Sequence, residues 1–184
     1  GTGSSTTLTS TTGSVTGSGN ITTAAGNTGA ITLNTATAGT LSGVISGGGA
    51  LVKQGAGTTT LTGTNTYTGT TTISSGGLQV GSGGSTGTLG AGAVTLSNNA
   101  RLSYLRSVDT AIANSISGSG SVAATITGIG SDLTVSQAIS LTGGTVELAA
   151  DGNLSLTQNI GTTNATSSAV ILTAGKSTAA GTSS

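Results

Sequence analysis

Residues 41–81 read LSGVISGGGALVKQGAGTTTLTGTNTYTGTTTISSGGLQVG, and this stretch decides the fold. Short runs in which every second residue is apolar, such as Leu78-Gln79-Val80, alternate with glycine clusters such as Gly47-Gly48-Gly49. Apolar residues two apart are typical of a strand with one buried face, and glycine clusters mark turns. No segment shows the 3.6-residue period of an amphipathic helix. The stretch therefore predicts strands of about three to six residues joined by tight turns.

The same alternation recurs on both sides of this stretch, so the prediction of an all-β fold extends to the whole chain. The alternating segments are 6–9, 30–33, 70–74, 78–80, 93–96, 133–135, 145–148 and 154–157. Further glycine-rich turns are expected at 81–84 and 143–144.

The 34 glycines restrict the possible architectures. A glycine inside a strand costs roughly 0.5–1 kcal/mol relative to alanine, and that many would exceed the roughly 5–15 kcal/mol stability of a domain. We therefore expect most glycines at bends, where a positive φ is useful. Strands this short, with corners this frequent, favour a coil of small rungs over a sandwich.

An internal repeat supports a coiled architecture. The segment 45–51 (ISGGGAL) reappears further along the chain as 116–122 (ISGSGSV), and looser matches follow. A break between two domains would fall near 97–109, where Arg101, Tyr104, Arg106 and Asp109 are concentrated. We prefer a single solenoid domain over 1–184, with 97–109 as a local irregularity.

Three consecutive motifs lie in the opening stretch: GALVKQGAGTTTLT at 49–62, NTYTG at 65–69 and TTISSGGLQVG at 71–81. Together, residues 41–81 resemble the autotransporter-associated β-strand repeat, which occurs in passenger regions of bacterial autotransporters. Residues 111–160 resemble it more weakly and lack the NTYTG element. The resemblance implies a right-handed parallel β-helix, secreted and displayed on a bacterial surface.

A parallel β-helix also follows from the residues themselves. Its rungs stack about 4.8 Å apart, and at roughly 20–25 residues per coil the chain would form about seven to nine coils. Asn65, Asn98 and Asn99 are candidates for side-chain ladders at the turns. The absence of proline fits, because every rung must donate hydrogen bonds to its neighbour.

The composition excludes most chemistry. Without cysteine or histidine the chain can form no disulfide and has no redox thiol and no histidine base. It also lacks the usual ligands of most protein metal sites. Four basic residues and two tyrosines do not suit a nucleic-acid surface, and no apolar run is long enough to span a bilayer. We therefore expect no catalytic, cofactor or metal-binding residues, no enzyme activity and no membrane insertion by this chain.

Two sequence matches to catalytic or phosphate-binding motifs are best interpreted as coincidence. Gly83-Gly84-Ser85-Thr86-Gly87 fits the G-x-S-x-G pattern, but no histidine is available to activate Ser85. Lys176-Ser177 resembles the end of a phosphate-binding loop, but the leading glycine is missing and no helix can follow.

The four carboxylates need separate consideration, because some parallel β-helices are polysaccharide-degrading enzymes that use paired acids. Asp132 could meet Glu147 in an adjacent coil, and Glu147 closely precedes Asp151 in the sequence. Acid–base catalysis on a glycoside needs two carboxyls within about 5–9.5 Å, and spacing alone does not establish that. Solvated turn residues are the preferred interpretation of these acids, including Asp109.

Threonine and tyrosine offer candidates for surface contacts. Interlocking T-x-T triplets over 58–72 are typical of ice-binding solenoids, but such a surface needs one triplet per coil. Tyr67 and Tyr104, the only aromatic residues, could stack on a sugar, although a structural role is preferred for Tyr67 in the NTYTG element. Asn20, Asn153 and Asn164 begin N-x-S/T sequons.

The sequence thus predicts a structural segment or subunit of a bacterial extracellular fibre. No polar capping element is visible at either end, so each end is expected to pair with another copy or with more of the same polypeptide. The alternative is an adhesin passenger that binds a glycan or a host protein through a lateral face. An enzyme and an ice-binding protein are less favoured.

Overall fold

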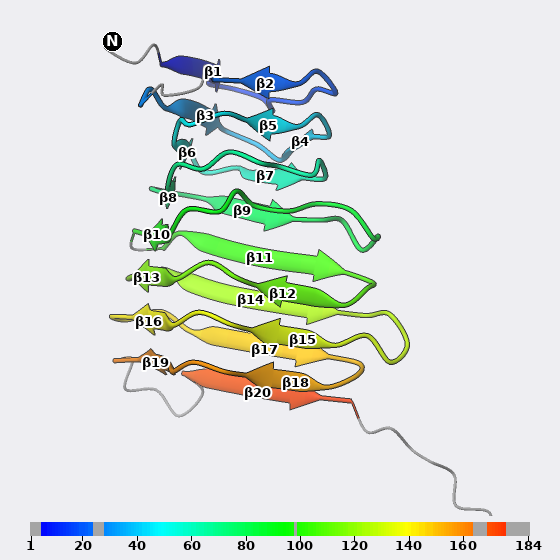
Figure 1. The fold of residues 1–184 in the computed structure, drawn as a ribbon. Coiled ribbons are helices and arrows are strands. Elements are labelled where there is room, and N and C mark those ends of the chain that lie inside the picture. Colours follow the sequence, from blue (N-terminus) through cyan, green and yellow to red (C-terminus); the bar gives the residue numbers. More distant parts are fainter. Residues whose placement is uncertain (1–4, 24–27, 98, 164–168, 176–184) are drawn as a thin grey trace, which may run out of the picture.

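The chain folds into a parallel β-solenoid in the computed structural model, which describes residues 5–23, 28–97, 99–163 and 169–175. All of its strand pairs are parallel, and the described residues contain no helix. The coils stack into an elongated body (Figure 1), and each coil has three faces, described here as faces one, two and three.

Face one is an eight-stranded sheet that runs the length of the solenoid. Its strands, in spatial order, are β1 (Thr6–Ser10), β3 (Ile31–Thr35), β6 (Leu51–Gln54), β8 (Thr71–Ile73), β10 (Val94–Leu96), β13 (Ile116–Gly118), β16 (Ile139–Leu141) and β19 (Ile160–Thr162).

Face two is a seven-stranded sheet. Its strands are β4 (Gly39–Leu41), β7 (Thr58–Leu61), β9 (Gly77–Val80), β11 (Arg101–Arg106), β14 (Ser121–Ile126), β17 (Val146–Ala150) and β20 (Val170–Ala174). Face three is divided into two short sheets, β2 (Ile21–Thr22) with β5 (Ile45–Ser46), and β12 (Thr110–Ile112) with β15 (Leu133–Val135) and β18 (Leu154–Leu156).

The coil length varies while the strands stay in register. The coil from Thr6 to its partner Ile31 is the longest on face one, and the coil from Ile31 to its partner Leu51 is among the shortest. The remaining coils on face one lie between these two lengths. These pairings confirm the predicted coil length and give about seven turns. All eight alternating segments form strands, as predicted.

The core is a set of apolar rows inside the coil, one residue per rung. Ile31, Leu51, Val94 and Ile139 occupy one such row on face one and are almost completely buried. Because parallel strands from successive coils place equivalent residues above one another, each apolar side chain is covered by the next coil.

The positions of the glycines correct one expectation. Eight of the described glycines have a positive φ, among them Gly47 and Gly118. Many others are required because two coils approach closely at a corner: a Cβ on Gly69 would lie 2.4 Å from the carbonyl oxygen of Gly49. Close stacking, more than backbone conformation, accounts for the glycine content.

The region 97–109 is also more regular than predicted. Residues 101–106 form β11, which pairs with β9 on one side and with β14 on the other. Asn99, with φ of 61°, makes the turn before this strand. The expectation of an irregular stretch here was wrong, because alternating Leu102 and Tyr104 supply the inward face of an ordinary strand.

The sequence repeat between 45–51 and 116–122 is not a structural period. Ile45 lies on face three whereas Ile116 lies on face one, and Leu51 lies on face one whereas Val122 lies on face two. The matched segments are therefore shifted by one face. The sequence match arises because all three faces carry the same short apolar alternation.

Candidate functional site

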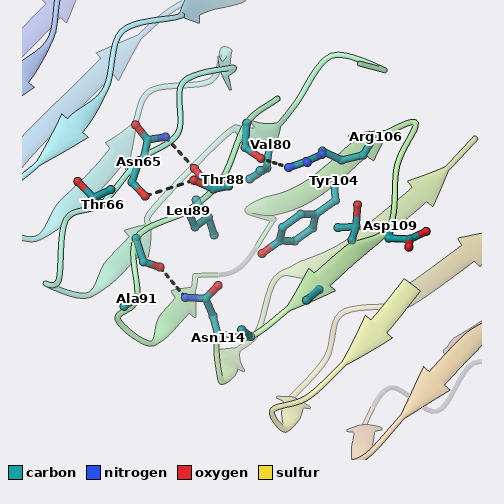
Figure 2. A pocket seen from close by; sticks show the side chains of 15 residues that line it. Asn65, Thr66, Val80, Thr88, Leu89, Ala91, Tyr104, Arg106, Asp109 and Asn114 are labelled. Atoms are coloured by element: carbon teal, nitrogen blue, oxygen red, sulfur yellow. Dashed lines mark hydrogen bonds between the residues drawn. The ribbon is translucent and has the colours of Figure 1, made fainter. Parts of the chain in front are cut away.

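Face three is interrupted between β5 and β12. Residues 81–92 form no strand there, apart from the single bridge between Thr64 and Thr88. The interruption opens a cavity of about 490 Å³ between residues 87–91 and β12, here called the notch. Figure 2 shows its lining residues, which come from three successive coils.

Asn65 fastens the coil on one side of the notch. Its Oδ1 accepts the amide N–H of Ile45 at 2.8 Å, and its Nδ2 donates to the carbonyl oxygen of Thr88 at 2.7 Å. The Thr88 hydroxyl donates in return to the Asn65 carbonyl at 3.2 Å. The predicted side-chain ladder at Asn65 is thus a bridge from one buried side chain to the backbones of two neighbouring coils.

Asn114 closes the opposite end of the notch. Its Nδ2 donates to the carbonyl oxygens of Gly90 and Gly92, each at 2.8 Å. The side chain is buried and spans the break in face three, so it replaces backbone pairing that β12 lacks on this side. Sequence reasoning did not single out Asn114, and only its separation from Gly90, close to the length of one coil, could have indicated it.

Arg106 holds the glycine-rich loop that borders the notch. Its guanidinium donates to the carbonyl oxygens of Gly87 and, at 2.8 Å, of Ser85, whereas its Nε is buried without a hydrogen-bond partner. The loop carrying Ser85 is therefore a structural turn clamped through its backbone, and no described residue supplies a histidine base because the chain has none.

The structure corrects the expectation that Tyr67 and Tyr104 make surface contacts, because both side chains are buried. The Tyr67 hydroxyl forms a 2.7 Å hydrogen bond with the Thr71 hydroxyl, and its ring packs where a side chain on Gly90 would clash. Tyr104 lines the notch from face two (Figure 2), and its hydroxyl has no hydrogen-bond partner. Burial, and secondarily the neighbouring Tyr67, raises the pKa of Tyr104.

Three of the four acids occupy structural positions at corners, whereas Glu147 lies within β17, so the interpretation as a turn residue was wrong for Glu147. Asp109 Oδ1 accepts the amide of Asp132 at 3.0 Å, and Asp132 Oδ1 accepts the amide of Asn153 at 2.7 Å, so the three residues form a ladder over successive coils. Asp151 Oδ2 accepts the amide of Gly130 at 2.8 Å. The carboxylates of these three aspartates accept hydrogen bonds from backbone amides of adjacent coils, which agrees with the prediction that they are turn residues.

The structure does not bring the proposed carboxylate pair together. Glu147 points outward from β17 on face two, whereas Asp132 precedes β15 on face three. Within the described ranges, no group of three acidic, cysteine or histidine residues could hold a metal ion.

Threonine triplets do not form an ice-binding array. On face two, outward-facing Thr40 stacks on Thr60, but the next rung has Gln79 at this position. Of the sequon residues, Asn20 accepts the Val44 amide at 2.9 Å and Asn153 belongs to the acidic ladder. Asn98, Asn164, Lys176 and Ser177 lie outside the described residues.

Lys53 is a buried cation that sequence reasoning did not assign to any site. Its side chain is fully buried, and its Nζ donates to the carbonyl oxygens of Gln54 at 2.5 Å, Gly55 at 3.0 Å and Ser75 at 3.5 Å. Burial lowers the pKa of Lys53 to about 8. These carbonyls lie at the corner between faces one and two, so the amine joins two coils from the inside.

Comparison with known proteins gives a family match over a segment beside the notch. Residues 51–80 match the model of the passenger-associated-transport-repeat, a segment that spans β6 to β9 and includes Lys53, Asn65 and Tyr67. No curated protein and no solved structure matches the chain. The described part of the chain also has no helix long and apolar enough to cross a membrane. Residues 51–80 of this parallel β-solenoid are therefore similar to the passenger-associated-transport-repeat, which fits an autotransporter passenger repeat.

Proposed function

We propose that this chain is a structural segment of a secreted bacterial surface protein, in which its solenoid extends by stacking further coils on its ends. The passenger repeat supports secretion to the cell surface. The mechanical role is supported by an architecture in which backbone ladders continue from coil to coil along three faces.

The observation that best supports this proposal is that apolar side chains of the last described coil are exposed to solvent. Val170 and Leu172 continue the inward rows of Val146 and Leu148, which are completely buried one coil earlier. In the last coil the exposed fractions of the two side chains are 38% and 46%. Leu156, in the row of the buried Val135, is exposed in the same way. Another coil stacked on this end would bury all three.

The first coil offers two matching edges. On face one, β19 would pair with β1 of a second copy. On face two, β20 would meet the segment around Gly17, which bridges to Leu41 in β4. Such a head-to-tail contact joins two different surfaces and leaves the same two surfaces free at the ends, so it propagates into a filament.

No arrangement of described side chains supports an enzyme on this solenoid. The notch contains one carboxylate, Asp109, and one of its oxygens accepts a backbone amide. A mechanical segment thus fits the sequence and the site better than a hydrolase or lyase does.

Electron microscopy and sedimentation velocity of the purified chain test this proposal. We expect filaments of uniform width whose length grows with protein concentration. Leu172→Asp should shorten or abolish them, because it places a charge in the row that stacking buries. Ile171→Asp is the matched control, since Ile171 lies on the same strand in the outward row of Glu147.

Both variants need melting curves and circular dichroism spectra like those of the wild-type chain for the comparison to hold. Isolated rods at all concentrations, or filaments that Leu172→Asp leaves unchanged while Ile171→Asp disrupts them, would contradict end-to-end stacking.

A further inference from the structure

We propose that the outward side of face one is a contact surface for a second copy of this chain, so that two solenoids lie side by side with these faces together. This contact goes beyond the end-to-end stacking proposed above and does not depend on it, because face one runs along the side of the solenoid and not across its ends (Figure 1).

Within the part of the chain that the structure describes, only face one is a single sheet from the first coil to the last. Its eight strands pair in register although the coils differ in length, and Figure 1 shows them stacked one above another. Long stretches without a strand lie elsewhere: residues 81–92 interrupt face three, and residues 127–132 form a corner between faces two and three. Face one is thus kept even while the other faces absorb the extra residues.

The outward positions of face one carry no charge. Their central column, which runs from Thr7 through Thr72 and Thr95 to Gly161, consists of four threonines, two serines, one valine and one glycine. The residues two positions before and after each member of this column are also uncharged. Among the described residues, Lys53 is buried and the other charged side chains belong to face two or to its corner with face three. Depletion of charge is typical of the centre of a protein–protein interface.

A second copy suits this surface better than a glycan does. A contact that pairs the same face of two copies places like residues near one another, and an uncharged face avoids the repulsion that like charges would cause there. Both tyrosines, the only aromatic residues, are buried, so face one has no ring that could stack on a sugar. Serine and threonine hydroxyls both donate and accept hydrogen bonds, which lets them pair across the contact.

The size of the surface also fits a dimer. Eight strands about 4.8 Å apart, each contributing about five residues, form a face of about 38 Å by 17 Å. Two such faces bury about 1,300 Å² in total, which lies within the range of about 1,200–2,000 Å² for specific interfaces. Because both copies use the same face, the contact closes after two copies. Filaments formed by end stacking would therefore be paired and of one width.

Sedimentation velocity of the full chain carrying Leu172→Asp, which blocks end stacking, measures the side contact alone. We expect a monomer–dimer equilibrium with a dissociation constant of about 1–100 μM, because the interface is small and polar. A monomer at all concentrations up to about 1 mM would overturn the proposal. If end stacking itself is wrong, the wild-type chain should show the same monomer–dimer equilibrium, so the two proposals fail separately.

Thr95→Arg, made in the Leu172→Asp chain, identifies the face, because Thr95 is exposed in the middle of the central column. We expect the dimer to weaken at least tenfold, since two arginines would enter an uncharged contact. Ser117→Arg, on the next strand of the same column, should act alike.

Thr125→Arg is the matched control, because it places the same charge at an exposed threonine in the middle of face two and should leave the dimer unchanged. Circular dichroism spectra and melting curves check that each variant folds like its parent. A dimer that both Thr95→Arg and Ser117→Arg leave intact, or one that Thr125→Arg weakens equally, would overturn face one as the contact surface.

Discussion

Lys53 shows how a single residue joins two coils in this core. Its amine donates to three backbone carbonyls from Gln54, Gly55 and Ser75, although the side chain is surrounded by the apolar interior. The family match includes this lysine. A lysine in a strand of otherwise ordinary alternation would be expected outside, and only its inward register, shared with Leu33 and Ile73, reveals its burial.

The titration of Lys53 predicts an unusual dependence of stability on pH. Burial lowers its folded-state pKa from 10.5 to about 8. Between these values the unfolded chain keeps a proton that the folded chain has released, so the free energy of unfolding rises with pH. We expect a gain of about 2 kcal/mol from pH 8 to pH 10, measured by urea unfolding.

Lys53→Met should remove this rise, because methionine fills a similar volume without a titratable group. Above pH 10 the stability should fall in both proteins, since burial raises the pKa values of Tyr67 and Tyr104 and the folded chain keeps protons that the unfolded chain loses. An identical slope below pH 10 in the wild-type chain and Lys53→Met would contradict this account.

At the scale of the strands and corners, close stacking of backbones decides which residues are allowed. Gly29, Gly49, Gly69 and Gly92 lie above one another at the corner between faces three and one, and a Cβ on any of the last three would clash with the carbonyl oxygen of the glycine one coil earlier. Such a column requires glycine whatever its φ, since any Cβ would enter the coil beneath.

Gly69→Ala should therefore lower the free energy of unfolding by about 1–3 kcal/mol, the usual cost of overpacking. Its Cβ would lie 2.4 Å from the carbonyl oxygen of Gly49. Gly143→Ala is the matched control, because nothing lies within 4 Å of its Cβ position and its φ is not in the left-handed region. Urea unfolding midpoints measure both, and equal midpoints for the two variants would show that the column tolerates side chains.

The strands could be predicted from the sequence, but the face of the solenoid to which each strand belongs could not. Alternating runs mark strands because each strand buries one face, and this rule held for every segment to which it was applied. The same rule does not tell which face a strand belongs to, and the sequence repeat therefore matches Ile45 with Ile116 although the two lie on different faces.

The notch could not be predicted for a different reason. Asn65 lies two coils before the coil that holds Arg106 and Asn114, and these residues come together only once the length of each coil is known. Coil lengths depend on how many residues each corner holds, and no local pattern fixes that number. The burial of Tyr104 similarly depends on its inward register in β11.

For the whole molecule, stability is a sum over coils and their neighbours. A central strand such as β11 pairs on both sides, whereas β20 pairs only with β17 among the described strands. We therefore expect amide hydrogen exchange to be slowest in β11 and β14 and fastest in β18, β19 and β20. Mass spectrometry of the dilute chain measures this gradient, and uniform protection from β11 to β20 would show that the solenoid opens as one cooperative unit.

The equivalence of the three faces has a consequence for how the chain finds its native threading. If a strand stacked one face out of register, apolar residues would still lie over apolar residues. The hydrophobic rows alone therefore discriminate poorly between the native register and a shifted one. We expect rejection of such mis-threaded forms to come from side chains whose hydrogen bonds can form in only one place, among them the amine of Lys53, the amide of Asn65 and the hydroxyl of Tyr67. All three fall within residues 51–80, so we expect this segment to contribute strongly to setting the register of the neighbouring coils.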